Sequence, residues 1–196
     1  MKKGIKRIVT AALAAVLMVT QLPVMNSKAA AGISIYGKAH VQTYGDTNGK
    51  IVKENGIDTL VLGTRGEAKR VESMTINLQN ESGYTGTIQY RVHRQTYGWE
   101  TRWAKDGSVS GTTGQAKRLE AIRIRLTGEL AQHYDIYYRV HAQTFGWMGW
   151  AKNGDPAGTT GHAKRLEAIQ IVLRAKGTGA PSASSQPAYV GGAVPQ

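Results

Sequence analysis

The chain has 196 residues, among them 25 Lys and Arg, 13 Asp and Glu, and no Cys. This length suits one ordinary domain, and the lack of cysteine excludes disulfides, thiol catalysis and Cys-based metal sites. Five of the basic residues and none of the acidic ones lie within residues 1–30, so the remainder carries a formal charge of +7. Its basic residues are dispersed and form no nucleic-acid motif, so we expect no nucleic-acid partner.

Residues 1–30 have the three parts of a secretory signal peptide. A basic start is followed by an apolar stretch at 8–19, and Ser27, Ala29 and Ala31 supply small residues for cleavage. A single membrane-spanning helix is disfavoured, because Pro23 interrupts the stretch and spanning needs about 20 apolar residues. We therefore expect a signal helix that is removed, and a secreted or cell-wall-associated protein without a stable membrane anchor.

Three copies of one repeat follow, at residues 34–78, 87–126 and 135–173. They are called copies one, two and three below. Corresponding positions hold the same residue type; they include His40, His93 and His141, then Gly66, Gly114 and Gly161, then Glu72, Glu120 and Glu167. Copy one is the most divergent, with Asp46 where the others have Trp, and with about five extra residues that predict a surface loop around 46–55.

Each copy begins and ends with residues that alternate between apolar and polar, which predicts strands with one buried face. In copy two, Ile88, Tyr90 and Val92 share one face, and Ile122 and Ile124 repeat the pattern near its end. Asp-Gly, Asn-Gly and Gly-Thr-Thr-Gly sequences between these runs predict turns. One copy cannot bury its apolar face alone, so we expect an all-β domain over 31–174 with pseudo-threefold antiparallel architecture. A β-prism-like arrangement is favoured and a β-trefoil-like one is the alternative. The Gly, Ser and Pro content of residues 175–196 predicts a flexible tail.

The motif of copies two and three resembles a known family. Gly-Trp, a second Trp, Asp-Gly or Asn-Gly, and then Gly-Thr-Thr-Gly-x-Ala-Lys-Arg-Leu-Glu-Ala-Ile are similar to the clostridial hydrophobic repeat with a Trp, the ChW repeat. The resemblance implies a secreted or surface protein of a Gram-positive bacterium that attaches to cell walls, polysaccharides or other proteins. It implies no catalytic residues.

The candidate ligand-binding residues lie on the polar strand faces of copies two and three. They are Arg91, His93, Gln95, Trp99 and Trp103, and Arg139, His141, Gln143, Trp147 and Trp150. Exposed indole rings stack on sugars, and the polar neighbours would bind hydroxyl groups. The alternative is that each Trp pair caps the hydrophobic core of its copy.

Two further residue sets recur once per copy. The three His residues would form a metal site only if they converged on a threefold axis, and otherwise each is a hydrogen-bonded strand residue. The Glu residues share the parity of the buried face, so each needs a partner such as the neighbouring Arg118 in copy two. A general acid is disfavoured, because an active site seldom occurs in three equivalent places.

The sequence therefore predicts a non-catalytic binding or attachment module without metal or cofactor. Its expected partner is an extracellular polysaccharide or cell-wall glycan. The alternative is a protein–protein adhesion or scaffolding module that contacts another secreted protein.

Overall fold

The computed structural model describes residues 32–196, so the predicted signal peptide lies outside the described part. The described chain is all-β, as expected, with one helical turn, α1 (Leu130–His133). Copy one supplies the first strands: β1 (Ile33–Val41), β2 (Gly45–Asn48), β3 (Lys50–Glu54), β4 (Ile57–Gly63) and β5 (Val71–Asn80). Copy two supplies β6 (Ile88–Arg94), β7 (Gly98–Trp99), β8 (Ala104–Lys105), β9 (Ser110–Gly111) and β10 (Leu119–Leu126). Copy three supplies β11 (Tyr134–Ala142), β12 (Gly146–Trp147), β13 (Ala151–Lys152), β14 (Ala157–Thr159) and β15 (Leu166–Ala175), and β16 (Tyr189–Val190) follows.

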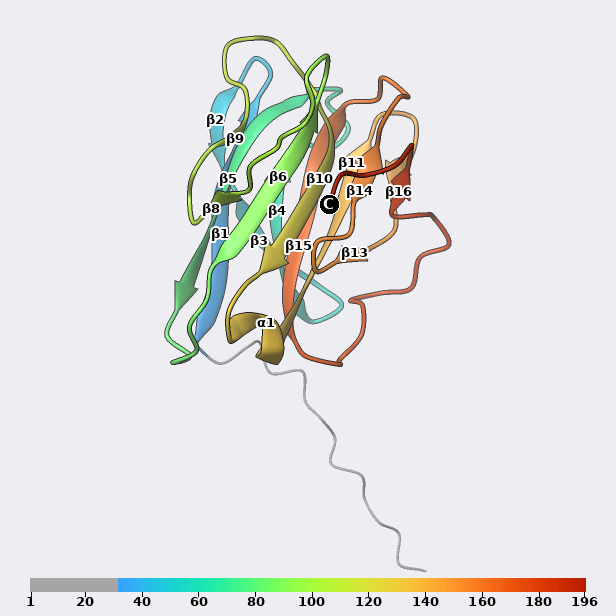
Figure 1. The fold of residues 1–196 in the computed structure, drawn as a ribbon. Coiled ribbons are helices and arrows are strands. Elements are labelled where there is room, and N and C mark those ends of the chain that lie inside the picture. Colours follow the sequence, from blue (N-terminus) through green and yellow to red (C-terminus); the bar gives the residue numbers. More distant parts are fainter. Residues whose placement is uncertain (1–31) are drawn as a thin grey trace, which may run out of the picture.

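The long opening and closing strands of each copy pair with each other, antiparallel, and run side by side down the molecule (Figure 1). The predicted buried face is confirmed: Ile88, Tyr90 and Val92 are fully buried, as are Ile122 and Ile124 opposite them. The three pairs contribute to one continuous hydrophobic core. The alternation of the sequence therefore identified the surfaces that hold the domain together.

Each of the three sheets also contains at least one strand from the next copy. The strand β9 of copy two pairs with β5 of copy one, and β14 of copy three pairs with β10 of copy two. The strand β4 of copy one pairs with β15 of copy three, which completes the cycle. Equivalent residues meet at the three crossings, because Gly111 faces Ser73, Gly158 faces Ala121, and Gly63 faces Ala168. Each copy thus depends on another for part of its sheet.

The prediction of a surface loop around residues 46–55 of copy one is wrong, because most of this segment forms strands. Residues 45–48 form β2, and residues 50–54 form β3, which pairs along its whole length with β4. The two-residue turn Asn55-Gly56 has positive φ at both positions (50° and 78°), as a type I′ hairpin requires. Ile51 and Val52, which precede the turn on β3, are β-branched and favour the extended conformation.

Residues 176–196 also differ from the expected flexible tail. Their strand β16 adds in parallel to β14, with Tyr189 beside Gly158 and Val190 beside Thr159. The side chains of Ala188 and Val190 pack against the core. In Figure 1 the end of the chain, marked C, lies beside β10 and β14. The composition of the segment did not reveal this pairing, because backbone hydrogen bonds to a sheet edge need no apolar periodicity.

Candidate functional site

The Glu predicted to be buried has partners in all three copies. In copy two, Glu120 is 5% exposed, and Arg118 Nε donates to its Oε1 at 2.8 Å. His93 Nδ1 is buried and lies 3.1 Å from Oε2, although not aligned for a strong hydrogen bond. Burial raises the pKa of Glu120, but His93 and Arg118 together outweigh it and leave the pKa below its ordinary value of 4.5.

The same arrangement recurs in copy three, and copy one has a modified form. Arg165 Nε donates to Glu167 Oε1 at 2.9 Å, and His141 Nδ1 lies 3.1 Å from Oε2. In copy one Arg70 pairs with Glu72 at 2.7 Å. His40 there contacts Asp46 at 2.7 Å, and Asp46 occupies the register position of Trp99. The three Glu residues therefore lie in structural clusters, one in each copy.

The Trp pair of copy two packs against guanidinium groups. The Arg91 side chain lies over both rings, 4.7 Å from the centroid of Trp103 and 5.9 Å from that of Trp99. Arg125 lies 4.0 Å from the Trp103 centroid and Arg123 lies 5.4 Å from it. Trp99 also meets the His93 ring edge-to-face at 5.6 Å. Cations over an indole face are attracted by its quadrupole, so these contacts fix the orientation of Trp103.

A cleft of about 410 Å³ opens beside Trp103. Its lining combines the indole with charged groups from Arg94, Glu100, Arg102 and Lys105. Hydrogen bonds hold the Glu100 side chain in place, because Gly111 N and Ser110 Oγ donate to its carboxylate at 2.9 and 2.5 Å. An aromatic side chain among polar groups, with net positive charge around it, can hold a polar ligand that also has an apolar face.

The corresponding surface of copy three is covered by residues 182–190. Ser182 Oγ accepts from Trp150 Nε1 at 3.1 Å, and the carbonyl of Pro187 accepts from Gly149 N at 3.0 Å. The carbonyl of Ala188 accepts from Gly158 N. It takes the place of the Glu100 carboxylate, which accepts from the equivalent Gly111 N in copy two. The two Trp surfaces that the sequence treats as equivalent are therefore different, since only that of copy two opens onto the cleft.

The predicted ligand residues fall into separate groups. All four Trp side chains are half-buried, so they are neither wholly core nor fully exposed. Arg91 is 2% exposed, which contradicts an open polar stripe on β6 and arises because two indoles and Pro195 cover it. The His residues join the Glu clusters. Gln95 and Gln143 lie past the ends of the long strands, where their backbone N–H groups bond to Arg118 and Arg165.

Sequence reasoning missed Arg123, Arg125 and Glu54. The two Arg residues alternate with Ile122 and Ile124 on β10, so their outward direction was visible in the sequence. Their convergence on Trp103 was not visible, because it requires the register of β10 against β6. Glu54 lies on β3, inside the segment expected to be a loop, and it reaches Arg139 of copy three at 3.3 Å.

The described residues contain no group of three metal-ligating side chains close enough to hold a metal ion. Within residues 32–196 no helix is both long and apolar enough to cross a bilayer. The family model described as clostridial hydrophobic W (ChW) matches residues 93–128 and 141–175. No curated protein and no solved structure matches the chain.

Proposed function

Because the chain carries two clostridial hydrophobic W repeats, we propose that it is a non-catalytic binding module for polysaccharide or cell-wall glycan. The binding surface in this proposal is the cleft beside Trp103 in copy two. The observation that carries the proposal is the composition of that cleft, in which an oriented indole stands among charged hydrogen-bonding side chains. A pyranose ring has an apolar face and a hydroxyl-lined edge, so it matches both parts of the lining.

A binding role, rather than a catalytic one, is supported by the state of the Glu carboxylates that recur in the three copies. A general acid needs a pKa raised towards neutrality, whereas the pKa of Glu120 lies below its ordinary value. Its carboxylate already contacts Arg118 and His93. Export is part of the proposal and rests on the sequence of residues 1–30. Outside the cell the module would meet wall glycans and secreted polysaccharides.

We also propose that the three copies close into a prism-like body with pseudo-threefold symmetry. The support comes from the cyclic exchange of β4, β9 and β14 and from the equivalent registers at the three crossings. A closed body of this kind presents three similar outer surfaces. Differences between the copies would then decide which surface binds: copy one lacks the Trp pair, and residues 182–190 cover copy three.

The test compares the two Trp surfaces. We expect Trp103→Ala to weaken retention on purified Gram-positive cell walls about tenfold or more, because the stacking surface is lost. Trp150→Ala serves as the matched control and should keep binding, since that indole is engaged by Ser182. Co-sedimentation measures binding, and circular dichroism melting confirms that both variants are folded. Equal retention by both variants, or a Trp103→Ala chain that no longer folds, would contradict the proposed surface.

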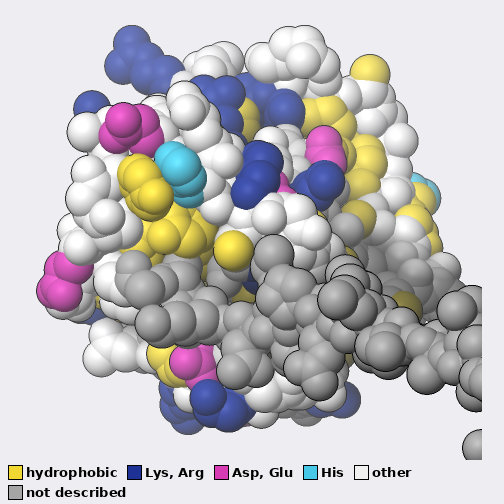
Figure 2. Space-filling view, turned by 90° about the horizontal axis from the view of Figure 1, so that it is seen from below, with side chains coloured by type: hydrophobic (Ala, Val, Ile, Leu, Met, Phe, Trp, Pro, Cys, Tyr) yellow, Lys and Arg dark blue, Asp and Glu magenta, His cyan; other side chains and the backbone are white. Residues whose placement is uncertain are grey.

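A second candidate function is adhesion to another protein, which a different region favours. Tyr36 and Ile51 are 54% and 57% exposed and line an apolar cleft of about 410 Å³ with Leu60 and Leu173. Apolar side chains also reach the surface on the lower face of the molecule (Figure 2). Pull-down from culture supernatant in the presence of competing soluble glycan separates the two functions. Ile51→Lys should abolish capture only if the partner is a protein.

A further inference from the structure

Three guanidinium groups surround Trp103 without any carboxylate partner. Arg91, Arg123 and Arg125 all lie within 6 Å of the Trp103 ring centre, yet none forms an ion pair within residues 32–196. Arg125 donates twice to the neutral side-chain oxygen of Gln89. Burial lowers the pKa of Arg91, and the charges of Arg123 and Arg125 lower it further. This side of copy two therefore holds positive charge that the described residues do not neutralise.

One backbone oxygen lies between two of these cations. The carbonyl oxygen of Pro195 accepts from Arg91 Nη2 at 2.5 Å and from Arg123 Nη1 at 2.5 Å. Arg91 is 2% exposed, and its buried Nε has no hydrogen-bond partner in the described part of the chain. Within residues 32–196, this neutral carbonyl is the only acceptor that Arg91 and Arg123 share, and one buried donor of Arg91 stays unsatisfied. Charged acceptors bind such donors about twice as strongly as neutral ones.

Copy three shows what the equivalent position accepts. Arg139 and Gln170 stand where copy two has Arg91 and Arg123, and each pair faces across its sheet in the same register. Both side chains there bind one carboxylate: Gln170 Nε2 donates to Glu54 Oε1 at 2.5 Å, and Arg139 Nη2 donates to Oε2 at 3.3 Å. The position in copy three, with the single cation Arg139, holds a carboxylate. The position in copy two, with the two cations Arg91 and Arg123, holds only a carbonyl.

We propose that the oxygen position between Arg91 and Arg123 is a subsite for an anionic oxygen group of a ligand, a carboxylate or a phosphate. Residues 193–196 act as a strap whose Pro195 carbonyl occupies the subsite until the anion displaces it. The inference rests on the proposed function, because it names the ligand class at the same Trp103 surface: an acidic rather than a neutral glycan. Ligand binding exchanges one neutral acceptor for a charged one that both guanidinium groups share.

The experiment uses the full mature chain and follows ¹H–¹⁵N NMR signals during titration. The three probes are neutral galactotriose, trigalacturonate and inorganic phosphate. Trigalacturonate differs from galactotriose in carrying carboxylates. Sodium chloride holds the ionic strength constant. We expect saturable shifts of the amide signals of residues 193, 194 and 196 with trigalacturonate, phosphate or both. The arms thereby distinguish a uronic acid from a phosphate ligand.

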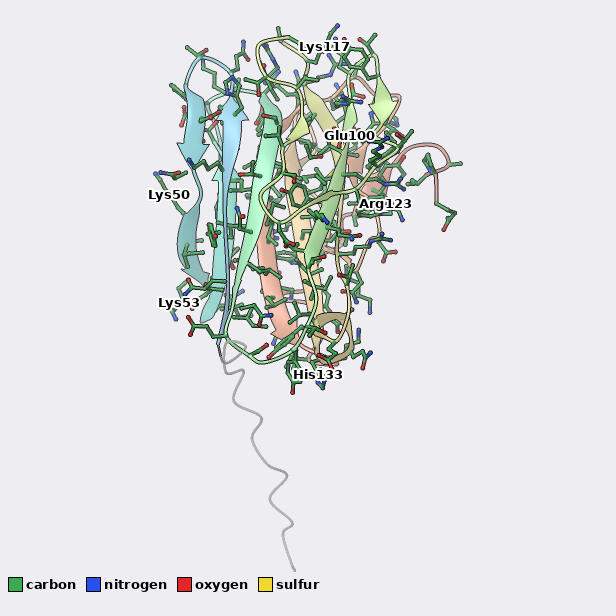
Figure 3. All side chains as sticks on the ribbon, turned by 60° about the vertical axis from the view of Figure 1, so that its left-hand side comes forward. Lys50, Lys53, Glu100, Lys117, Arg123 and His133 are labelled. Carbon is green, nitrogen blue, oxygen red and sulfur yellow. The ribbon has the colours of Figure 1, made fainter. Side chains whose placement is uncertain are left out.

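Arg123→Gln tests the assignment, because copy three carries Gln at this position and folds around it. We expect this variant to weaken anion binding about tenfold, as the loss of one charge-assisted hydrogen bond implies. Lys50→Gln removes the same charge from the opposite side of the molecule (Figure 3) and should have no effect. Anion binding that Arg123→Gln leaves unchanged, or strap signals that respond to neither anion, would overturn the subsite. Anion binding that depends on Arg123 without retention on cell walls would overturn the glycan function alone.

Discussion

The Glu, Arg and His cluster is the residue-scale feature that the copies share most closely. A carboxylate that is 5% exposed costs free energy unless it is paired, and Glu120 meets that cost through Arg118 and His93. The backbone oxygen of the corresponding Glu72 also accepts from Thr112 N at the crossing with copy two. The cluster therefore stabilises the crossing at which a strand of one copy pairs with a strand of the next.

Substitution of Glu120 should make the free energy of unfolding less dependent on pH in the acidic range. The folded-state pKa of Glu120 is depressed, so its stabilisation is full above its ordinary pKa and is lost as pH falls through the folded value. Glu120→Gln should lower the free energy of unfolding by about 2 kcal/mol at pH 7, and the difference from the parent should shrink below about pH 4. Thermal melting from pH 7 to pH 3 measures this, with the exposed Glu81→Gln as control. A difference that is constant with pH would contradict the assignment.

Single residues also show how far sequence could predict the site. The burial of Glu120 and its pairing with Arg118 follow from the parity of the strand and the spacing of the two residues. The burial of Arg91 does not follow, because parity places it on the outer face and only Trp103 and Pro195 cover it there. Such cover comes from segments distant in sequence, which a local pattern does not encode.

At the scale of elements, the exchanged strands are the feature that makes the copies interdependent. Two of the three are short, with two residues in β9 and three in β14, so no alternation marked these two as strands or indicated their partners. Long strands such as β6 were predicted correctly because seven residues suffice for a period of two. The Gly-Thr-Thr-Gly sequences predict turns, and their first Gly proves to be the crossing residue in copies two and three.

The crossing glycine should tolerate no side chain. Gly111 has φ of 108°, and an added Cβ would lie 2.5 Å from the carbonyl oxygen of Glu72 and 2.6 Å from Ser73 Cα. Gly111→Ala should therefore lower the free energy of unfolding by about 3 kcal/mol or more, from backbone strain and steric overlap together. Gly114→Ala is the matched control: its φ is 74° and its Cβ would meet nothing within 4 Å, so about 1 kcal/mol is expected. Urea unfolding measures both, and equal losses would mean that the crossing is not close-packed.

At the scale of the whole molecule, three related copies produce three unequal surfaces. Asp46 replaces the first Trp in copy one, and residues 182–190 cover the Trp surface of copy three. In copy two, the half-buried Trp103 lies beside an open, polar cleft. The sequence predicted two equivalent Trp surfaces, because the covering segment has no periodicity that would reveal its docking. Asymmetry among similar copies is thus the basis of the proposed binding function.

The indole N–H signals of the four Trp residues test this account most directly. They are resolved by ¹H–¹⁵N NMR of a chain that begins at residue 31 and are followed while soluble fragments of Gram-positive cell-wall glycan are added. We predict that the Trp103 signal shifts in a saturable way, whereas those of Trp147 and Trp150 stay in place. Slow solvent exchange of the Trp150 N–H should confirm its bond to Ser182. Equal shifts at Trp103 and Trp150, or movement of Trp150 alone, would contradict the assignment of binding to copy two.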